Sequence, residues 1–405
     1  MEIEVARPFD LAHDRLLRAV LVREEPRTHV LALSVHHIVS DEWSMGVLIT
    51  ELSTLYAAEE RGVASSLPPL TVQYADYAAW QRSWLNEAAL TEQHAFWRAE
   101  LAGAPALLEL PTDRPRARVQ RHRGRIHAFQ LEASVADGLE TLARQADTTL
   151  FMTLMAGYAI LLQRYSGQPD VVIGSPIANR VRPELEPLIG FFVNTLPFRI
   201  DLSGEPTVRE LLARVRRSAL AAYANQDVPF EQLVEELRPE RNLGHAPIFQ
   251  VMLVLQNAPA PDLGQTSLAI TPVAPHAVAA KFDLTLSLER TSRGLAGMIE
   301  YDTDLFDAAT IERMAHHLDQ VLRAMAGDPS LVIDDVPLID SAERHRLVEE
   351  FNTTLPIAPA HDNVIRLFER HAESHPDQMA IRAGGESIRY GALDARAGHL
   401  ATALT

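Results

Sequence analysis

The feature that most constrains this chain is the run HHIVSDEWS at residues 36–44, which directly follows the apolar run VLALSV at residues 30–35. The apolar run predicts a buried strand. Side chains alternate between the two faces of a strand, so His36 and His37 lie on opposite faces if the strand continues to His37. The two imidazoles then cannot converge on one metal ion or one substrate. Because histidine titrates near neutral pH, we expect one of them to carry chemistry and the other to support it.

The composition excludes several classes of protein. With 405 residues, of which 47% are hydrophobic, the chain is long enough for two or three domains with real cores. It has no cysteine, which excludes disulfides, thiolate nucleophiles and cysteine-ligated zinc, and its formal net charge of -17 argues against nucleic acid as a partner. No apolar run has membrane-spanning length and no secretory signal opens the chain. We therefore expect a cytoplasmic protein that binds neither nucleic acid nor membrane.

Common nucleotide-binding and nucleophile motifs are absent from the sequence. Lys281 is the only lysine and no Gly-Lys pair exists, so a phosphate-binding loop is excluded. No Gly-x-Ser-x-Gly nucleophile elbow occurs. The sequence thus predicts neither a bound cofactor nor a metal site.

Hydrophobic spacing predicts strands and helices in alternation. Two strands are expected at residues 15–24 and 30–37, followed by a helix with Ser44 as its N-cap and an apolar face that starts at Met45. A second helix is expected over residues 74–101, with an aromatic stripe typical of a core. This mixture predicts an α/β fold. The further expected helices are 150–165 and 208–223, and the further expected strands are 170–177, 248–255 and 282–288.

Other segments read as loops, surfaces or linkers. The Pro/Arg-rich residues 111–125 predict a solvated loop or linker, and the pair His316-His317 is expected on a helix surface. Residues 326–363 have linker composition with one short helix, and a new helix is expected at 364–375. Paired strands should follow at residues 380–382 and 388–390. Since the chain stops inside the next expected helix, we expect a fragment of a longer protein.

Taken with its other motifs, the chain resembles the condensation domains of nonribosomal peptide synthetases. The run at residues 36–44 resembles the family's HHxxxD core motif, and the match extends over most of the chain. Residues 357–405 resemble the opening of an adenylation domain. The remaining motifs that carry the resemblance are QYADYAAW at 73–80, IGFFVNTL at 189–196, NQDVPFE at 225–231, and Arg241-Asn242 with PIFQV at 247–251.

The resemblance implies two lobes like chloramphenicol acetyltransferase, set in a V with the active site in a tunnel between them. Residues 1–110 then form a partial first lobe, 111–345 the second lobe, 346–363 a linker and 364–405 the start of an adenylation domain. The implied reaction transfers a donor acyl or peptidyl group from a carrier-protein phosphopantetheine thioester to the amine of an acceptor aminoacyl thioester, forming an amide bond. The implied partners are the upstream and downstream peptidyl carrier proteins and the adjoining adenylation domain, and the domain itself binds no cofactor.

The same resemblance implies that the catalytic residues are His37, His36 and Asp41. His37 would accept a proton from the attacking nitrogen or hold it by a hydrogen bond, and the sequence does not choose between the two. His36 is expected to orient the strand end, and Asp41 to fix the turn as a structural anion paired with arginine or backbone N–H groups. Trp43 is expected in the core. Polar residues that would shape the tunnel or the contact between lobes are Asn194, Gln226 and Asp227.

Two departures from the family pattern matter. The opening motifs have no counterpart and the match begins near residues 7–10, so the start of the first lobe is expected to be missing, including an arginine that the family would offer to Asp41. Glu42 stands where the family most often has glycine, which is disfavoured if the turn requires φ > 0. We expect the partial lobe to leave a sheet edge and apolar surface uncovered, with low solubility and no amide formation by the fragment.

Three alternative functions stay open. An epimerisation domain shares the histidine motif and the lobes, and a free acyltransferase could use coenzyme A or form an ester. The adenylation-domain start expected directly downstream argues against both. A truncated, non-catalytic fragment that binds carrier proteins without turnover fits the same motifs.

Overall fold

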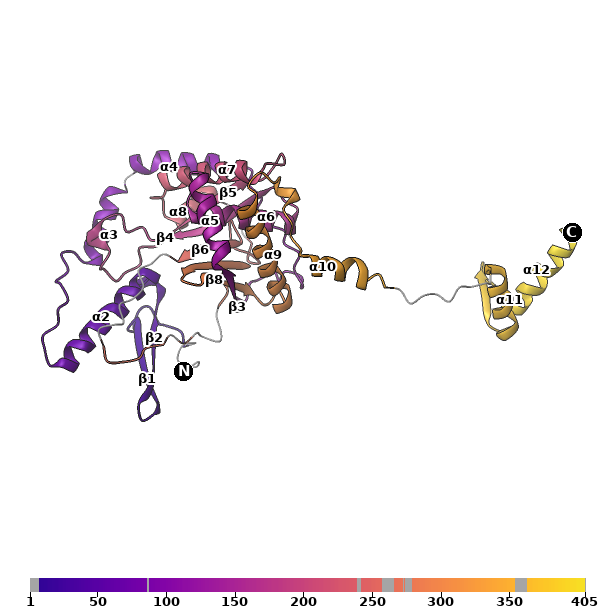
Figure 1. Ribbon diagram of the computed structural model, residues 1–405, viewed down its shortest axis with the longest axis horizontal. Helices are drawn as coiled ribbons and strands as arrows, with labels where there is room; N and C mark the ends of the chain where they lie inside the picture. The colour runs from indigo at the N-terminus through magenta and orange to yellow at the C-terminus, as the bar shows by residue number, and fades with distance from the viewer. Residues whose placement is uncertain are drawn as a thin grey trace. The chain divides into compact units, whose positions relative to one another are not determined.

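A computed structural model describes residues 7–85, 87–238, 242–256, 266–271, 273, 279–353 and 363–404 (Figure 1). The chain divides into two compact units, residues 1–339 and 340–405. The first unit contains the two-stranded hairpin β1–β2, a six-stranded sheet and most of the helices. The described residues of the second contain a two-stranded hairpin and three α-helices, of which the last two contact each other.

The helices and strands have the following bounds. The strands are β1 Leu17–Glu25, β2 Thr28–Val35, β3 Gly124–Glu132, β4 Asp170–Ile177, β5 Asn194–Asp201, β6 Val251–Gln256, β7 Leu284–Thr291, β8 Gly294–Asp302, β9 Met379–Ala383 and β10 Glu386–Arg389. The α-helices are α2 Glu42–Arg61, α3 Tyr74–Trp84, α4 Glu87–Glu100, α5 Ala133–Gln145, α6 Leu150–Ser166, α7 Val208–Ala224, α8 Phe230–Leu237, α9 Ala308–Gly327, α10 Ser341–His345, α11 Val364–Ser374 and α12 Tyr390–Leu404. Short 3-10 turns span His37–Val39, Pro183–Leu185 and Ile333–Asp335, and a π-helical turn spans Arg346–Glu350.

The six-stranded sheet is mixed, with the order β3-β8-β7-β6-β4-β5. Strand β6 runs parallel to both of its neighbours, β4 and β7, whereas the other pairs are antiparallel. Helices α5, α6, α7 and α9 contact one another and the strands. The α/β class expected from the sequence is therefore present, and most of its expected helices and strands agree within a few residues.

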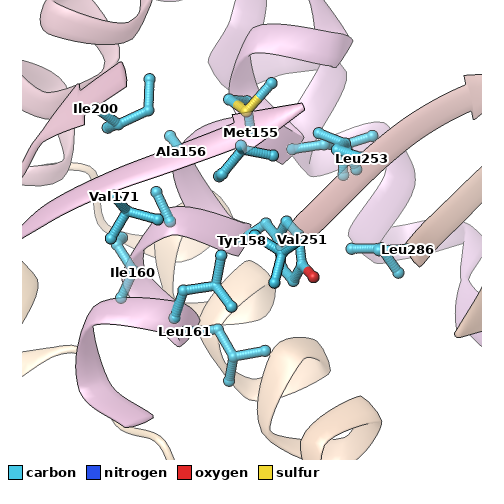
Figure 2. Packing of buried hydrophobic residues seen from close by; sticks show 14 of the residues in the cluster. Met155, Ala156, Tyr158, Ile160, Leu161, Val171, Ile200, Val251, Leu253 and Leu286 are labelled. Atoms are coloured by element: carbon cyan, nitrogen blue, oxygen red, sulfur yellow. The ribbon is translucent and has the colours of Figure 1, made fainter. Parts of the chain in front are cut away.

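The core of the first unit lies between helix α6 and the sheet (Figure 2). Every residue from Met152 to Leu162 is buried, because this helix is apolar on all sides and has neighbours all round. Both ends of α6 are capped. At its start the side chain of Thr149 accepts a hydrogen bond from the Met152 amide, and at its end Gly167 adopts a left-handed conformation with φ of 72°. In Figure 2, Met155 and Tyr158 of this helix lie among side chains of β6 and β7.

Three local expectations about secondary structure are wrong. The strand expected to reach His37 ends at Val35, and a 3-10 turn begins at His37. The single helix expected over residues 74–101 is two helices, interrupted at Leu85, whose φ and ψ of -77° and 69° are not helical. Helix α2 begins earlier than expected, because its N-cap is Asp41 rather than Ser44.

The hairpin β1–β2 is not the buried strand pair that its composition predicts. No residue of either strand is fully buried, and the face that carries Leu17, Leu21 and Leu31 is the exposed one. Within the described residues these two strands pair only with each other. The apolar face of the hairpin is therefore not covered by another described element. The expected apolar face of α2 is likewise exposed at Leu52 and Leu55.

The Pro/Arg-rich segment is a mostly exposed loop, as expected, but three of its arginines hold it to the rest of the unit as a strap. The guanidinium of Arg116 binds both carboxylate oxygens of Asp283, which is completely buried. Arg114 and Arg123 also form ion pairs, with Asp307 and Asp304. The sequence did not reveal these ion pairs because the acidic partners lie more than a hundred residues away, where spacing cannot indicate them.

Two further expectations need correction. His317 is buried in α9 and its Nδ1 lies 2.7 Å from the hydroxyl of Tyr165, whereas His316 is exposed as expected. The linker composition from residue 326 hides core residues, since Ile333 and Val336 are both buried. Because polar and proline residues surround these two apolar positions, the composition did not indicate that this segment packs into the core. Residues 354–362 of the expected linker lie outside the described residues.

Candidate active site

The two histidines lie on a tight turn between β2 and α2. The strand ladder ends where the His36 amide donates to the carbonyl of Leu16, at 2.9 Å. His36 is then the N-cap of the 3-10 turn, and Ser40 ends that turn. Helix α2 begins two residues later, so β2 and α2 together fix the turn from both sides.

His37 has one ring nitrogen committed and one available. Its Nδ1 lies 2.6 Å from the carbonyl oxygen of Ser40. Because a carbonyl oxygen can only accept, Nδ1 carries the hydrogen, and in the neutral ring Nε2 keeps its lone pair. The ring of Phe191 meets the imidazole edge to face, with centroids 5.1 Å apart and planes at 90°. Nε2 of His37 is therefore the ring atom that can receive a proton.

His36 has the opposite arrangement. Its Nδ1 accepts a hydrogen bond from the amide of Ile38 at 3.0 Å, so the hydrogen of the neutral ring is on Nε2. Phe9 contacts this ring edge to face at 5.7 Å. The lone pair of His36 thus stabilises the turn instead of facing a substrate, which agrees with the supporting role expected for one of the two histidines.

Asp41 is buried and fully hydrogen-bonded. Its Oδ1 accepts from the amide and the hydroxyl of Ser44, at 2.8 and 2.7 Å, and from the guanidinium of Arg180 at 3.2 Å. Its Oδ2 accepts from the amide of Phe192 at 2.9 Å. The carboxylate therefore joins the start of α2 to residues 139 and 151 positions later, as expected of a structural anion paired with arginine and backbone N–H groups.

Arg180 is the arginine that pairs with Asp41. It follows β4, its side chain is 2% exposed, and it also donates to the carbonyls of Leu185 and Leu188. Its guanidinium lies 4.1 Å from the centroid of the Phe192 ring. The arginine partner expected for Asp41 is therefore present, and it comes from the loop after β4 and not from the opening of the domain.

The charges of this pair are set by competing effects. Burial alone would raise the pKa of Asp41, but the hydrogen bonds from Ser44 and Phe192 and the charge of Arg180 outweigh it and hold that pKa below its ordinary value. Burial lowers the pKa of Arg180, and the Asp41 carboxylate opposes this change. Asp41 is thus an anion at neutral pH and is not suited to carry a proton.

The motif at residues 189–196 packs directly against this turn. The Ser44 hydroxyl lies 2.8 Å from the carbonyl of Gly190 and accepts from the Gly190 amide at 3.1 Å. The hydroxyl of Tyr74 donates to the carbonyl of Phe191 at 2.7 Å. A Cβ atom on Gly190 would lie 2.1 Å from the Tyr74 ring, so this close approach requires glycine.

The motif at residues 225–231 is held from two directions. Asn194 donates to the carbonyls of Gln226 and Val228 and accepts from the Phe230 amide. Asp227 exchanges two hydrogen bonds with Gln93 of α4, at 2.8 and 3.0 Å. Asn194 therefore holds this segment to β5, and Asp227 holds it to α4. Arg241, named in the last motif, lies outside the described residues.

Three neighbours of the histidines have distinct positions. Trp43 is half-buried, and its Nε1 donates to the carbonyl of Glu186 at 2.9 Å. Ser44 is buried at the third position of the helix α2, where it contacts Asp41 and is not the cap. Glu42 is the first residue of α2, where negative φ is normal, so a non-glycine residue is accommodated without strain.

Sequence reasoning missed Arg180, Phe191 and Tyr74 as parts of this site. Tyr74 and Phe191 lie inside two of the recognised motifs, so their position beside the histidine turn could have been suspected. Arg180 follows a strand in the segment Ala178-Asn179-Arg180, and no spacing rule connects it with Asp41. Among the described residues, no three potential metal ligands cluster, and no helix there has the length and apolar character needed to cross a membrane.

Together, the mixed sheet and the histidine turn define an acyltransferase domain of the chloramphenicol acetyltransferase type. A family model described as "Condensation domain" matches residues 1–348. One of the linear gramicidin synthase proteins of Brevibacillus parabrevis is 47% identical over 99% of this chain, and malpinin synthetase of Mortierella alpina is 45% identical over 99%. The chain spans only 5% of the length of each of these relatives.

Solved structures show the same likeness. A four-domain nonribosomal peptide synthetase, holo-AB3403, matches 98% of this chain and 31% of its own with a TM-score of 0.83 and 25% identity. The X-domain from teicoplanin biosynthesis matches 83% of this chain and 78% of its own with a TM-score of 0.76 and 32% identity. The chain belongs to the condensation domain family of nonribosomal peptide synthetases, the acyltransferases that form amide bonds on phosphopantetheine-bound substrates.

Proposed function

We propose that His37 is the catalytic residue of amide-bond formation in this domain. The acceptor amine attacks the carbonyl carbon of the donor thioester, forming a C–N bond and breaking the C–S bond. The proton lost by the nitrogen goes to Nε2 of His37 and then to the departing thiolate, so atoms and charge balance. General acid-base help of this kind contributes roughly 10² to 10⁴ in rate.

The observation that carries this proposal is the hydrogen bond between His37 Nδ1 and the carbonyl of Ser40, at 2.6 Å. It fixes the tautomer in which Nε2 is a base, a role that oriented imidazoles serve in other acyl transfers. His36 has its lone pair engaged with Ile38, so the same step is not open to it at Nδ1. In this proposal His36 and Asp41 support the turn and do not touch the reacting atoms.

The surrounding parts follow from the same proposal. Residues 1–110 and 111–345 act as the two lobes, residues 346–363 as a linker, and residues 364–405 as the start of an adenylation domain within a larger cytoplasmic synthetase. The likeness to holo-AB3403 over 98% of this chain supports the last assignment, since it extends through α11, β9, β10 and α12. The partners are upstream and downstream peptidyl carrier proteins. DNA downstream of the Thr405 codon that does not continue into an adenylation domain would contradict this arrangement.

A second candidate is a binding domain without turnover. A complex of the X-domain and OxyB from teicoplanin biosynthesis has been solved, and that X-domain is 33% identical to this chain, so a domain of this fold can bind another protein. One experiment separates the two candidates. Donor and acceptor carrier proteins are loaded with aminoacyl groups and mixed with the synthetase, and dipeptidyl product on the acceptor carrier is measured by intact-protein mass spectrometry. Product that disappears in a His37→Ala variant supports catalysis, whereas carrier binding without product supports the binding domain.

A further inference from the structure

The ring of Phe191 is the side chain that meets the imidazole of His37. The two rings are edge to face, with a centroid distance of 5.1 Å and an interplanar angle of 90°. The hydrogen bond to Ser40 restrains only the Nδ1 side of the imidazole. A ring held at a single atom can still tilt, so a second contact is needed to fix the direction of Nε2.

The backbone on both sides of Phe191 is anchored to the same turn. The preceding residue, Gly190, donates its amide to the Ser44 hydroxyl, and the following residue, Phe192, donates its amide to Asp41. The carbonyl of Phe191 itself accepts from Tyr74. The position of the Phe191 ring is therefore set by Asp41 and Ser44, which also begin the helix that follows His37.

We propose that Phe191 is a positioning residue that holds the imidazole of His37 with Nε2 directed at the acceptor amine. This inference rests on the proposed role of His37. In this arrangement the buried Asp41–Arg180 pair affects catalysis indirectly. It fixes the position of Phe191, and Phe191 fixes the orientation of the His37 ring. An aromatic ring opposite an imidazole favours the edge-to-face geometry observed here, and an aliphatic side chain of similar size has no such preference.

The test is a double-mutant cycle with Phe191→Leu and His37→Ala, measured in the full synthetase with loaded carrier proteins. Phe191→Leu should lower kcat roughly tenfold and leave KM unchanged, since misplaced catalytic groups cost rate more than binding. Phe191→Tyr, which keeps the ring, should restore most of the rate. In the His37→Ala background Phe191→Leu should have no further effect, because a positioning residue acts only through its target.

A matched control is Phe151→Leu, which trims another half-buried ring whose edge-to-face partner is Phe198. It should affect thermal stability without changing kcat. An equal loss from Phe191→Leu in both His37 backgrounds, or no loss in either, would overturn the inference. If His37→Ala alone keeps the parent rate, the proposed function fails first, and this outcome is separate from the other two.

A readout independent of turnover decides the same point in the 405-residue chain. Long-range 1H–15N spectra of 15N-histidine-labelled protein report imidazole tautomers, and the His37 signals are assigned by their loss in His37→Ala. The parent should show a single tautomer with the hydrogen on Nδ1. Phe191→Leu should keep this tautomer, because the Ser40 hydrogen bond fixes it, but should broaden the signals of the carbon-bound protons of the His37 ring as the ring exchanges between orientations. Ring signals as sharp as those of the parent would contradict the inference.

Discussion

His36 and His37 are neighbours in the chain and hold opposite tautomers. Nδ1 of His36 accepts from the amide of Ile38, and Nδ1 of His37 donates to the carbonyl of Ser40. The imidazole of His36 therefore caps the 3-10 turn with its Nδ1 lone pair. The imidazole of His37 donates from Nδ1 and keeps the lone pair of Nε2 available. Substitutions at the two positions should accordingly differ in kind.

Replacing His36 should first affect folding. His36→Ala removes the acceptor for the Ile38 amide, and loss of an N-cap of this type costs about 0.5 to 2 kcal/mol. His36→Asn keeps a side-chain acceptor and should recover part of the loss. Melting temperature and amide formation are measured on the same samples. Full loss of activity at an unchanged melting temperature would mean that His36, and not His37, carries the chemistry.

Replacing Asp41 with asparagine should be strongly destabilising. The introduced side-chain amide would leave Arg180 buried without a counter-charge and would face N–H donors with a donor of its own, a loss of about 3 to 5 kcal/mol. Asp10→Asn is the matched control, because Asp10 pairs with His13 at an exposed position and its loss should have little effect. Denaturant unfolding gives both values. An Asp41→Asn variant that unfolds at the parent's midpoint yet has no turnover would make Asp41 catalytic and not structural.

The stability provided by Asp41 should depend on pH in a defined direction. Its pKa in the folded chain lies below the ordinary value of 3.8, so the stabilisation is complete above that value and is lost as the pH falls through the lower folded pKa. The difference in unfolding free energy between the parent and Asp41→Asn should therefore be constant above about pH 5 and should shrink in stronger acid. A difference that grew on acidification would contradict this assignment.

Glu42 should behave in the opposite way. Partial loss of hydration raises its pKa above 4.5, the neighbouring carboxylates of Asp41 and Glu289 add to this, and a hydrogen bond from Gln256 opposes it. A raised carboxyl pKa means that the ionised form weakens the fold at neutral pH, and protonation removes this cost as the pH falls toward the unfolded value. Glu42→Gln should therefore stabilise the chain at pH 7 and have no effect below about pH 4.5. Urea midpoints at the two pH values test this, and a loss of stability at pH 7 would refute it.

The exposed face of the hairpin β1–β2 should make the chain associate. Leu21 is 67% exposed and lies opposite Leu31, which is 46% exposed, on an isolated two-stranded sheet within the described residues. The paired change Leu21→Lys with Leu31→Glu places opposite charges across the strands and should increase the monomer fraction in analytical ultracentrifugation. Leu220→Lys, which changes an exposed leucine on α7, is the control and should leave association unchanged. A monomeric parent chain would remove the basis of this prediction.

Much of the fold was accessible from local patterns, and two of the failures share one cause. Helix α6 and strand β4 were predicted closely because their apolar runs and end signals are contained in the segments themselves. The strap at Arg116 and the burial of His317 were missed because their partners, Asp283 and Tyr165, are distant in sequence. Long-range ion pairs leave no periodicity that a single sequence could reveal.

The site shows the same division. The HHxxxD spacing placed His37 and Asp41 on one turn, and the expected pairing of Asp41 with arginine and backbone N–H groups is observed. The sequence could not identify Arg180 as the arginine, nor could it determine which ring nitrogen of His37 is engaged. Both depend on contacts with segments that begin after residue 177 or on the exact path of a short turn.

The most direct test of the catalytic role of His37 is single-turnover amide formation by the full synthetase carrying His37→Ala, with donor and acceptor carriers loaded in advance. We expect a fall of roughly 10² to 10⁴ in the rate of product formation, with carrier loading unchanged. A rate within about threefold of the parent, far short of the range for lost acid-base catalysis, would contradict the central claim and remove His37 from the mechanism.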